Sequence, residues 1–391
     1  MASKIPSGVW LLGLVSMLMD VSSEMIHSLL PLFMIGPLGA SVFMVGLVEG
    51  LGESTALIVK VFSGAWSDRL GKRKVLAVFG YGMAAATKPL FAVAPVAGVV
   101  LVARLLDRIG KGMRGAPRDA LITDITPSDM RGAAFGLRQS LDTIGAVAGP
   151  LLAVVLMLAW ANDFRAVFWV AVIPAIASVT LLWLGVREPT GSSAPKRSPP
   201  LTRKAMRRMG RDFWMVVIFG AVFTLARFSE AFLVLRAQQA GMSLAMAPLV
   251  MVAMNVVYAA TAYPFGKLSD NYSHHKMLAL GLSVLIASDL VLAQDGGWML
   301  VLGGVALWGV HMGLTQGLLS RMVADAAPDN MRGTAFGFFN LASGIAMLLA
   351  SVLAGLLWER YGAAATFYAG AAFSLLSLLA LGWHARFGGM R

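Results

Sequence analysis

The chain has 391 residues, of which 58% are hydrophobic and only 13% are charged, and its mean hydropathy is +0.75. Soluble domains carry about 25% charged residues, so the composition excludes an ordinary soluble protein and predicts an integral membrane protein. The net charge of +12 does not indicate nucleic-acid binding, because basic loops beside a membrane explain it. The absence of cysteine excludes disulfides and thiolate metal sites.

Apolar stretches of about 20 residues recur along the chain, and each is long enough to cross a hydrocarbon core about 30 Å thick. Backbone groups in lipid must pair internally, so we expect these stretches to be helices. The first stretch is too long and too acidic for a cleavable signal peptide. We predict twelve spans, at residues 8–36, 40–63, 75–95, 97–120, 132–160, 164–186, 212–236, 243–266, 276–294, 297–322, 333–358 and 363–385.

Two loops occur twice in the same order. Residues 63–74 are matched by residues 265–276, and residues 127–136 are matched by residues 328–337. A repeat of this length predicts an all-α integral membrane fold, with twelve transmembrane helices in two six-helix pseudo-repeats. Parallel repeats of this kind are typical of secondary transporters that bind substrate between the two halves.

Basic residues gather in alternate loops, which predicts the orientation of the chain. Lys72 and Arg73 follow the second span, Arg131 follows the fourth, and the basic, Pro- and Ser-rich residues 187–211 follow the sixth. Loops rich in Lys and Arg stay in the cytoplasm, so we expect a multi-pass protein of a bacterial inner membrane with both termini cytoplasmic. The expected domains are a six-helix bundle at 1–186, a cytoplasmic basic linker at 187–211 and a second bundle at 212–391.

The first repeated loop resembles the signature of the major facilitator superfamily (MFS) between its second and third helices. In the second copy Gly266 and Asp270 persist, while Asn271 and Ser273 replace the arginine and the second glycine. Gly145, Gly149 and Pro150 resemble a motif of the superfamily's antiporters, although the glycine pair that usually follows is missing. The resemblance implies an MFS fold with cytoplasmic loops that latch the halves together. The expected gating residues are Gly64, Asp68, Arg69, Gly71, Lys72, Arg73, Arg131, Gly145, Gly149, Pro150, Asp270 and Arg332.

Ionisable residues within spans are costly in lipid, so they face the bundle interior and mark ion or substrate pathways or structural ion pairs. Arg104 with Gly110 and Gly112 resembles an arginine motif that the superfamily links to proton coupling. We expect His311 to be a packing residue more readily than a proton carrier. The candidate substrate and proton pathway comprises Asp20, Glu24, Glu49, Glu53, Arg104, Asp107, Arg108, Arg138, Asp142, Arg227, Glu230, Asn255 and His311.

These features predict a proton-coupled secondary active transporter that works by alternating access. Efflux of a small molecule or ion by antiport is favoured, and the alternative is a proton symporter that takes up a small organic anion, as Arg104, Arg108 and Arg227 would suit. No phosphate-binding glycine loop is present, which disfavours ATP-driven transport. We expect no enzymatic activity, cofactor or metal site. The expected partners are the substrate, protons and membrane lipid, and the protein is expected to be a monomer.

Overall fold

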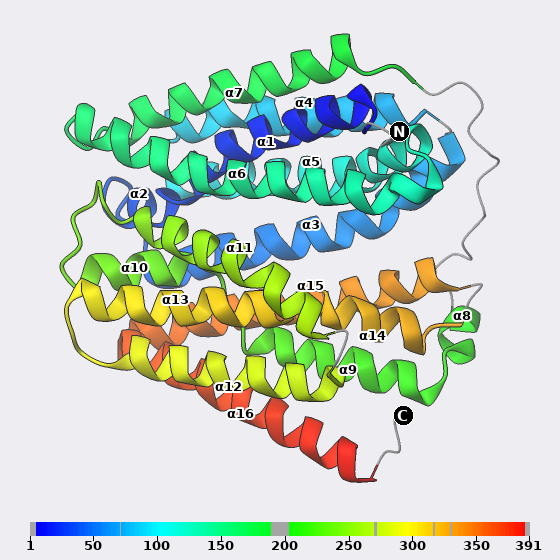
Figure 1. The fold of residues 1–391 in the computed structure, drawn as a ribbon. Helices are drawn as coiled ribbons and strands as arrows, with labels where there is room; N and C mark the ends of the chain where they lie inside the picture. Colours follow the sequence, from blue (N-terminus) through cyan, green and yellow to red (C-terminus); the bar gives the residue numbers. More distant parts are fainter. Residues whose placement is uncertain are drawn as a thin grey trace. The chain divides into compact units, whose positions relative to one another are not determined.

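The computed structural model describes residues 5–70, 72–188, 203–269, 272–315, 317–328 and 331–387, and this part of the chain is helical almost throughout and contains no strand (Figure 1). The elements are α1 (Ser7–His27), α2 (Leu30–Ile35), α3 (Val42–Leu70), α4 (Arg73–Val93), α5 (Ala97–Ile125), a 3-10 turn (Ser128–Met130), α6 (Arg131–Ala159), α7 (Phe164–Gly185), α8 (Arg203–Arg208), α9 (Arg211–Leu225), α10 (Ala231–Gln239), α11 (Leu249–Ser269), α12 (His274–Ala293), α13 (Trp298–Thr315), α14 (Leu318–Ala326), α15 (Arg332–Tyr361) and α16 (Ala363–Phe387).

Ten helical segments of the described chain are long and apolar enough to cross a membrane. The two other predicted spans are helical as well. Helix α5 has 29 residues but carries a stripe of charges, and the span predicted at 212–236 is divided between α9 and α10. The predicted all-α fold of two six-helix repeats is therefore confirmed.

The first repeated loop begins later than predicted. The sequence predicts a loop from residue 63, but α3 continues as a helix to Leu70. In the second repeat α11 likewise continues to Ser269. Beyond the hydrocarbon core water can solvate polar side chains on a helix, so the end of an apolar run does not end the helix.

Three predicted spans are interrupted, which the sequence pattern did not indicate. Helix α1 ends at His27 before α2 starts at Leu30, and α9 ends at Leu225 before α10 starts at Ala231. In the tenth span Gly317 precedes α14 with a φ of 80°, a left-handed conformation that glycine adopts without strain. Apolarity says nothing about such breaks, because a broken helix stays as hydrophobic as a continuous one. Discontinuous helices of transporters frequently line substrate sites.

The structure divides into two compact units. The first contains residues 1–33 and 55–197, and the second contains residues 34–54 and 198–391. The domain boundaries expected at 186–187 and 211–212 therefore remain predictions. Residues 189–202 of the expected linker lie outside the described residues. The division runs through α3, so the start of this helix groups with the second unit.

In the first unit α1 packs against α6 and α7, and α4 packs against α5 and α7. Figure 1 shows these helices running alongside one another. Their shared apolar core includes Val9, Leu12, Met19, Tyr81 and Leu182, each without solvent exposure. This packing places one face of α5 toward α1 and α4, which determines where its charged side chains meet their partners.

In the second unit α12 packs against α13 and α16, and α9 packs against α15 and α16. The start of α3 crosses α15 at small residues. A Cβ atom at Gly50 would lie 3.1 Å from the carbonyl oxygen of Leu348, and one at Gly355 would lie 2.9 Å from the Cα atom of Phe43. Small residues let helix backbones approach closely in a membrane.

Candidate functional site

A buried ion pair joins three helices of the first unit. The Lys88 ammonium on α4 donates hydrogen bonds to Asp107 Oδ1 on α5 at 2.8 Å and to Ser23 Oγ on α1 at 2.9 Å. The side chains of Lys88 and Asp107 are only 2% and 4% exposed. A buried charge is tolerated when it is paired and hydrogen-bonded. Asp107 is therefore held as the partner of Lys88.

The same carboxylate also faces the arginines of its own helix. Arg108 Nε lies 3.7 Å from Asp107 Oδ2, and the Arg108 guanidinium contacts the His27 imidazole at the end of α1. Arg104, one turn earlier on α5, is 1% exposed. Because His27 is the last residue before the break between α1 and α2, these contacts anchor the interruption to α5.

Two carboxylates on α1 are held more loosely. Asp20 Oδ1 lies 3.8 Å from Arg114 Nη2, and Glu24 Oε1 lies 3.8 Å from His27 Nδ1. Their side chains are 25% and 20% exposed. Both separations exceed hydrogen-bond distance, so neither carboxylate is fixed as Asp107 is. The guanidinium of Arg114 stacks over the ring of Tyr81, at 4.7 Å from its centroid.

A third group of charges lies further along α5 and on α6. Arg138 Nη1 donates to Asp142 Oδ2 at 2.9 Å, so these two residues pair within one helix. Arg118 donates to Ser16 Oγ at 2.5 Å and lies 3.9 Å from Asp142 Oδ2. Arg138 and Asp142, both predicted pathway residues, thus form an ion pair in the structure.

We refer to the charged residues of α5 from Arg104 to Asp119, with the ionisable groups facing them from α1, α4 and α6, as the α5 ionic cluster. Basic side chains outnumber acidic ones in it. The acidic members are Asp20, Glu24, Asp107, Asp119 and Asp142. The basic members are Lys88, Arg104, Arg108, Lys111, Arg114, Arg118 and Arg138, with His27 beside them.

The other predicted pathway residues belong to the second unit. Glu49 is 6% exposed, with Oε2 at 3.4 Å from Ser229 Oγ, and Glu53 follows one turn later on α3. Arg227 and Glu230 lie in the break between α9 and α10.

His311 and Asn255 lie on α13 and α11 of the second unit. His311 is fully buried, its Nδ1 lies 2.7 Å from the Gly281 carbonyl, and its ring stacks on Phe223. A carbonyl can only accept, so Nδ1 carries the hydrogen, as expected of a packing residue.

The predicted gating loops are described only in part. The side chains of Asp68 and Arg69, and Gly71 and Asp270 entirely, lie outside the described residues. Lys72, Arg131 and Arg332 are exposed at or beside helix starts. Gly64 approaches α5, since a Cβ atom there would lie 3.7 Å from Ala116 Cβ.

Arg73 has partners that the sequence did not indicate. Its guanidinium pairs with Asp124, and the backbone N–H groups of Arg73 and Lys74 donate to the carboxylate of Glu188 at 2.7 Å and 3.0 Å. A carboxylate at a helix N-terminus satisfies amides that have no partner within the helix. Glu188 and Asp124 therefore fix the start of α4 after the repeated loop.

Sequence reasoning also left Lys88, Ser23 and His27 out of the pathway. Lys88 carried a signal, because it is a lone ammonium in an apolar span. Ser23 and His27 carried none, since their role depends on which face of α1 meets α4 and α5.

The glycines of the antiporter-like motif make the α1–α6 contact. A Cβ atom at Gly145 would lie 2.7 Å from the Met17 carbonyl oxygen, and one at Gly149 would lie 2.8 Å from both Glu24 Cβ and the Val21 carbonyl oxygen. Pro150 follows inside α6 and is buried. These residues therefore hold α6 against the face of α1 that presents Asp20 and Glu24.

Replacing Gly149 with alanine is expected to destabilise the protein by about 1–3 kcal/mol, because the methyl group would force the two backbones apart. Gly136→Ala on the same helix is the matched control, since nothing lies within 4 Å of its Cβ position. There alanine should stabilise the helix by up to about 1 kcal/mol. Thermal unfolding in detergent measures both changes, and equal shifts for the two variants would contradict close packing at Gly149.

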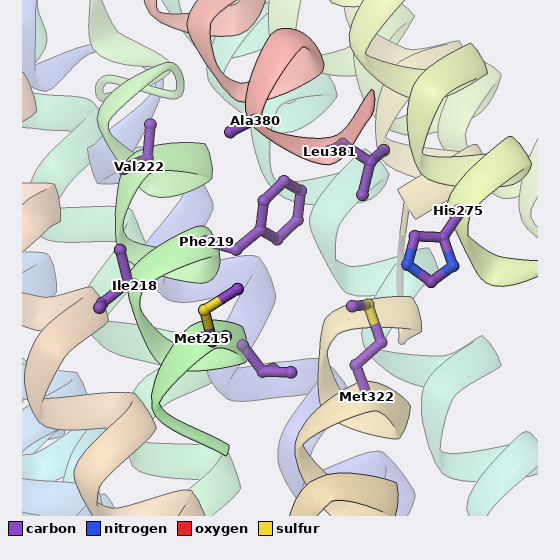
Figure 2. Close-up of a pocket in the computed structure, with 9 residues that line it drawn as sticks. Met215, Ile218, Phe219, Val222, His275, Met322, Ala380 and Leu381 are labelled. Atoms are coloured by element: carbon purple, nitrogen blue, oxygen red, sulfur yellow. The ribbon is translucent and has the colours of Figure 1, made fainter. Parts of the chain in front are cut away.

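An apolar pocket of about 140 Å³ lies in the second unit, and none of the predicted pathway residues lines it. Figure 2 shows Met215, Ile218 and Phe219 of α9 on one side, with Met322 and Leu381 across the opening. Ile218 is 62% exposed, so the pocket opens at the surface. Its lining offers no carboxylate for proton exchange.

Comparison with known proteins agrees with this architecture. The model of the Major Facilitator Superfamily matches residues 12–254 and 227–387. An uncharacterized MFS-type transporter of Methanocaldococcus jannaschii is 31% identical over 384 residues, covering 97% of this chain and 95% of that protein. Multidrug resistance protein MdtH of Shigella boydii is 24% identical over 359 residues, covering 90% of this chain and 86% of its own.

A solved structure shows the same fold. An inward-facing bacterial homologue of the human lysosomal transporter Spinster aligns with 97% of this chain and 95% of its own, with a TM-score of 0.72 and 17% identity. The family model covers nearly the whole chain, and its two matches parallel the two sets of repeated loops. The chain belongs to the Major Facilitator Superfamily, and it is a multi-pass membrane transporter with the fold of that family.

Proposed function

We propose that this protein is a proton-coupled secondary transporter that alternates access across a bacterial inner membrane and exports a small molecule by antiport. The observation that carries the proposal is the loose hold on Asp20 and Glu24, which are partly exposed and lie 3.8 Å from Arg114 and His27, respectively. A carboxylate with weak partners and access to solvent can bind and release a proton. Asp107, tied to Lys88 at 2.8 Å, is a poor candidate for this role.

The α5 ionic cluster can couple protons to substrate by competition. A cationic substrate that binds Asp20 or Glu24 takes the place of a proton, so its binding releases protons, as antiport requires. An anionic substrate that binds Arg114 or Lys111 instead neutralises the positive charge that stabilises the ionised form of these carboxylates. The carboxylates would then take up protons, as symport requires.

Efflux is favoured by a relative's name, and the expected orientation is compatible with it. MdtH is named as a multidrug resistance protein, and export is one way for a membrane transporter to confer resistance. The basic residues near 72–74 and in 187–211 favour a cytoplasmic location for those segments. Protons entering the cell down their gradient would then drive substrate outward.

Uptake of a small organic anion by proton symport is the second candidate. It is favoured by the excess of basic over acidic side chains in the α5 ionic cluster, since guanidinium groups bind carboxylates and phosphates well. The two candidates require proton movements of opposite sign on substrate binding.

The test uses permanently charged probes, which bind no protons themselves. Purified protein in weakly buffered detergent receives tetraphenylphosphonium as the cation or benzenesulfonate as the anion, and a pH-sensitive dye follows the solution. Acidification by the cation supports antiport, and alkalinisation by the anion supports symport. Binding of a probe without any proton movement would overturn proton coupling at this cluster.

Direction is tested separately in proteoliposomes with an acidic exterior. Antiport should speed the loss of preloaded probe, whereas symport should make the vesicles accumulate external probe. Collapse of the pH gradient with a protonophore is the control, and a flux that ignores the collapse would contradict both candidates.

A further inference from the structure

Asp289 of α12 is a buried carboxyl group that the proposed coupling does not use. It is 0% exposed, and neither of its oxygens has a hydrogen-bond partner among the described residues. Its surroundings are apolar and closely packed. A Cβ atom at Gly370 on α16 would lie 2.7 Å from Asp289 Oδ2 and 3.0 Å from the ring of Phe228.

The repeat shows how unusual this position is. Arg131 and Arg332 of the repeated loops are 201 positions apart, and the same offset relates Lys88 to Asp289. It also relates Asp107 to Trp308. The first unit thus pairs Lys88 with Asp107, whereas the second unit has a carboxyl group and an indole at the corresponding positions.

Helix packing supports this correspondence. A Cβ atom at Gly80 on α4 would meet Gly110 and Arg114 of α5. Gly281 on α12, 201 positions later, would meet His311 and Thr315 of α13, which are the counterparts of Gly110 and Arg114. The α4–α5 and α12–α13 pairs therefore cross in the same register.

Among the side chains that the structure describes, none that is basic is placed to balance a charge on Asp289. The titratable residue on α13 is His311, whose Nδ1 is bound to the Gly281 carbonyl. Among the described side chains of α16 the titratable residue is Tyr368, which is exposed. Arg236 binds the last turn of α12, through the Leu292 and Gln294 carbonyls and Asp295. The basic residues 274–276 begin the helix, about 20 Å away at 1.5 Å per residue.

The break between α9 and α10 presents Phe228 to this site. Its ring lies 5.5 Å from that of Trp308, whose Nε1 is buried without a partner among the described residues. Arg227 and Glu230 flank Phe228 in the chain, and no ion pair with Asp289 is seen in the described part of the structure. An ionised carboxylate in such surroundings would be strongly unfavourable, whereas a neutral carboxylic acid is tolerated.

We propose that Asp289 is a second protonation site of this transporter, and that it holds its proton while α12, α13 and α16 are packed around it. Ionisation then requires these helices or the α9–α10 break to move, so that water reaches Asp289 or a donor such as Trp308 Nε1 can hydrogen-bond its carboxylate. The site would release its proton only when this packing opens. Its participation in transport rests on the proposed proton coupling, but its protonation does not.

Infrared spectroscopy of the purified protein tests the protonation directly. Protein with 13C-labelled aspartate should show, at neutral pH, the carbonyl stretch of a protonated aspartic acid. Asp289→Asn should remove this band. Asp289→Glu should also remove it at the 13C-shifted frequency, because the glutamic acid carries no label. Asp295→Asn, at an exposed position just after the end of the same helix, should keep it. Absence of the band in the wild type, or its survival in both Asp289 variants, would overturn the proposal.

The role in transport has a separate readout. Protons moved per bound tetraphenylphosphonium or benzenesulfonate should fall in Asp289→Asn relative to Asp295→Asn. Equal counts with the infrared band present would overturn participation in coupling. If neither probe moves protons in the wild type, the proposed function fails, while the infrared result still decides whether Asp289 is protonated.

Discussion

Replacing Asp107 with leucine is expected to destabilise the protein by about 3–5 kcal/mol, because it leaves a buried ammonium without its counter-ion. Lys88 would keep its hydrogen bond to Ser23, while Arg108, which faces the same carboxylate, would add a like charge nearby. Lys88→Met should cost less, since Arg108 lies 3.7 Å from Asp107 and can still balance the carboxylate. Thermal unfolding in detergent, followed by tryptophan fluorescence, measures both losses.

The double variant Lys88→Met/Asp107→Leu separates this pair from general damage to the core. Removing both charges should recover much of the stability lost with Asp107 alone, because no unpaired ammonium remains. Asp124→Asn provides the contrast, since its pair with Arg73 is partly exposed and should contribute at most about 1 kcal/mol. Strictly additive losses in the double variant would show that Lys88 and Asp107 are not energetically coupled.

Replacing Asp20 with asparagine is expected to abolish proton movement on substrate binding while leaving the fold intact. Asparagine has the same shape but cannot exchange a proton, and the ion pair that it removes is long and partly solvated. Glu24→Gln, one turn further along α1, should reduce the number of protons moved rather than eliminate the response. The dye measurement with tetraphenylphosphonium and benzenesulfonate provides the readout.

Asp129→Asn is the control for this experiment, because Asp129 is exposed in the short turn before α6. It should behave as the wild type in both proton movement and unfolding temperature. Loss of proton movement in Glu24→Gln but not in Asp20→Asn would place the exchanging proton one turn along α1. An unchanged response in both variants would exclude these two carboxylates as the coupling site.

The sequence was informative where the membrane imposes a simple requirement. Each span had to be apolar and about 20 residues long, so hydropathy located the helices. The charged stripe of α5 was visible for the same reason, since residues such as Arg104 and Asp107 stand out against an apolar background. What hydropathy could not locate were the helix breaks near Ser28 and Arg227, because they leave the composition unchanged.

Pairing within the α5 ionic cluster depended on information that lies outside any single span. Asp107 was expected among the proton carriers, yet its contact with Lys88 comes from a different helix and gives it a tight partner. Asp20 was expected among the proton carriers as well, and its distant partner and partial exposure distinguish it from Asp107. A side chain's partners follow from helix rotation and crossing, which periodicity does not determine.

The amino-acid sequence by itself determined the membrane class, the number of spans, the duplication and the family resemblance, because each is a property of composition or of residues in order. Tertiary structure alone decided that Lys88 holds Asp107, that Glu188 caps the start of α4, and that Asp289 is buried with no charged partner among the described residues. The physical reason is that the state of a charge in a membrane protein depends on the groups within a few ångströms of it, and packing brings those groups from other helices.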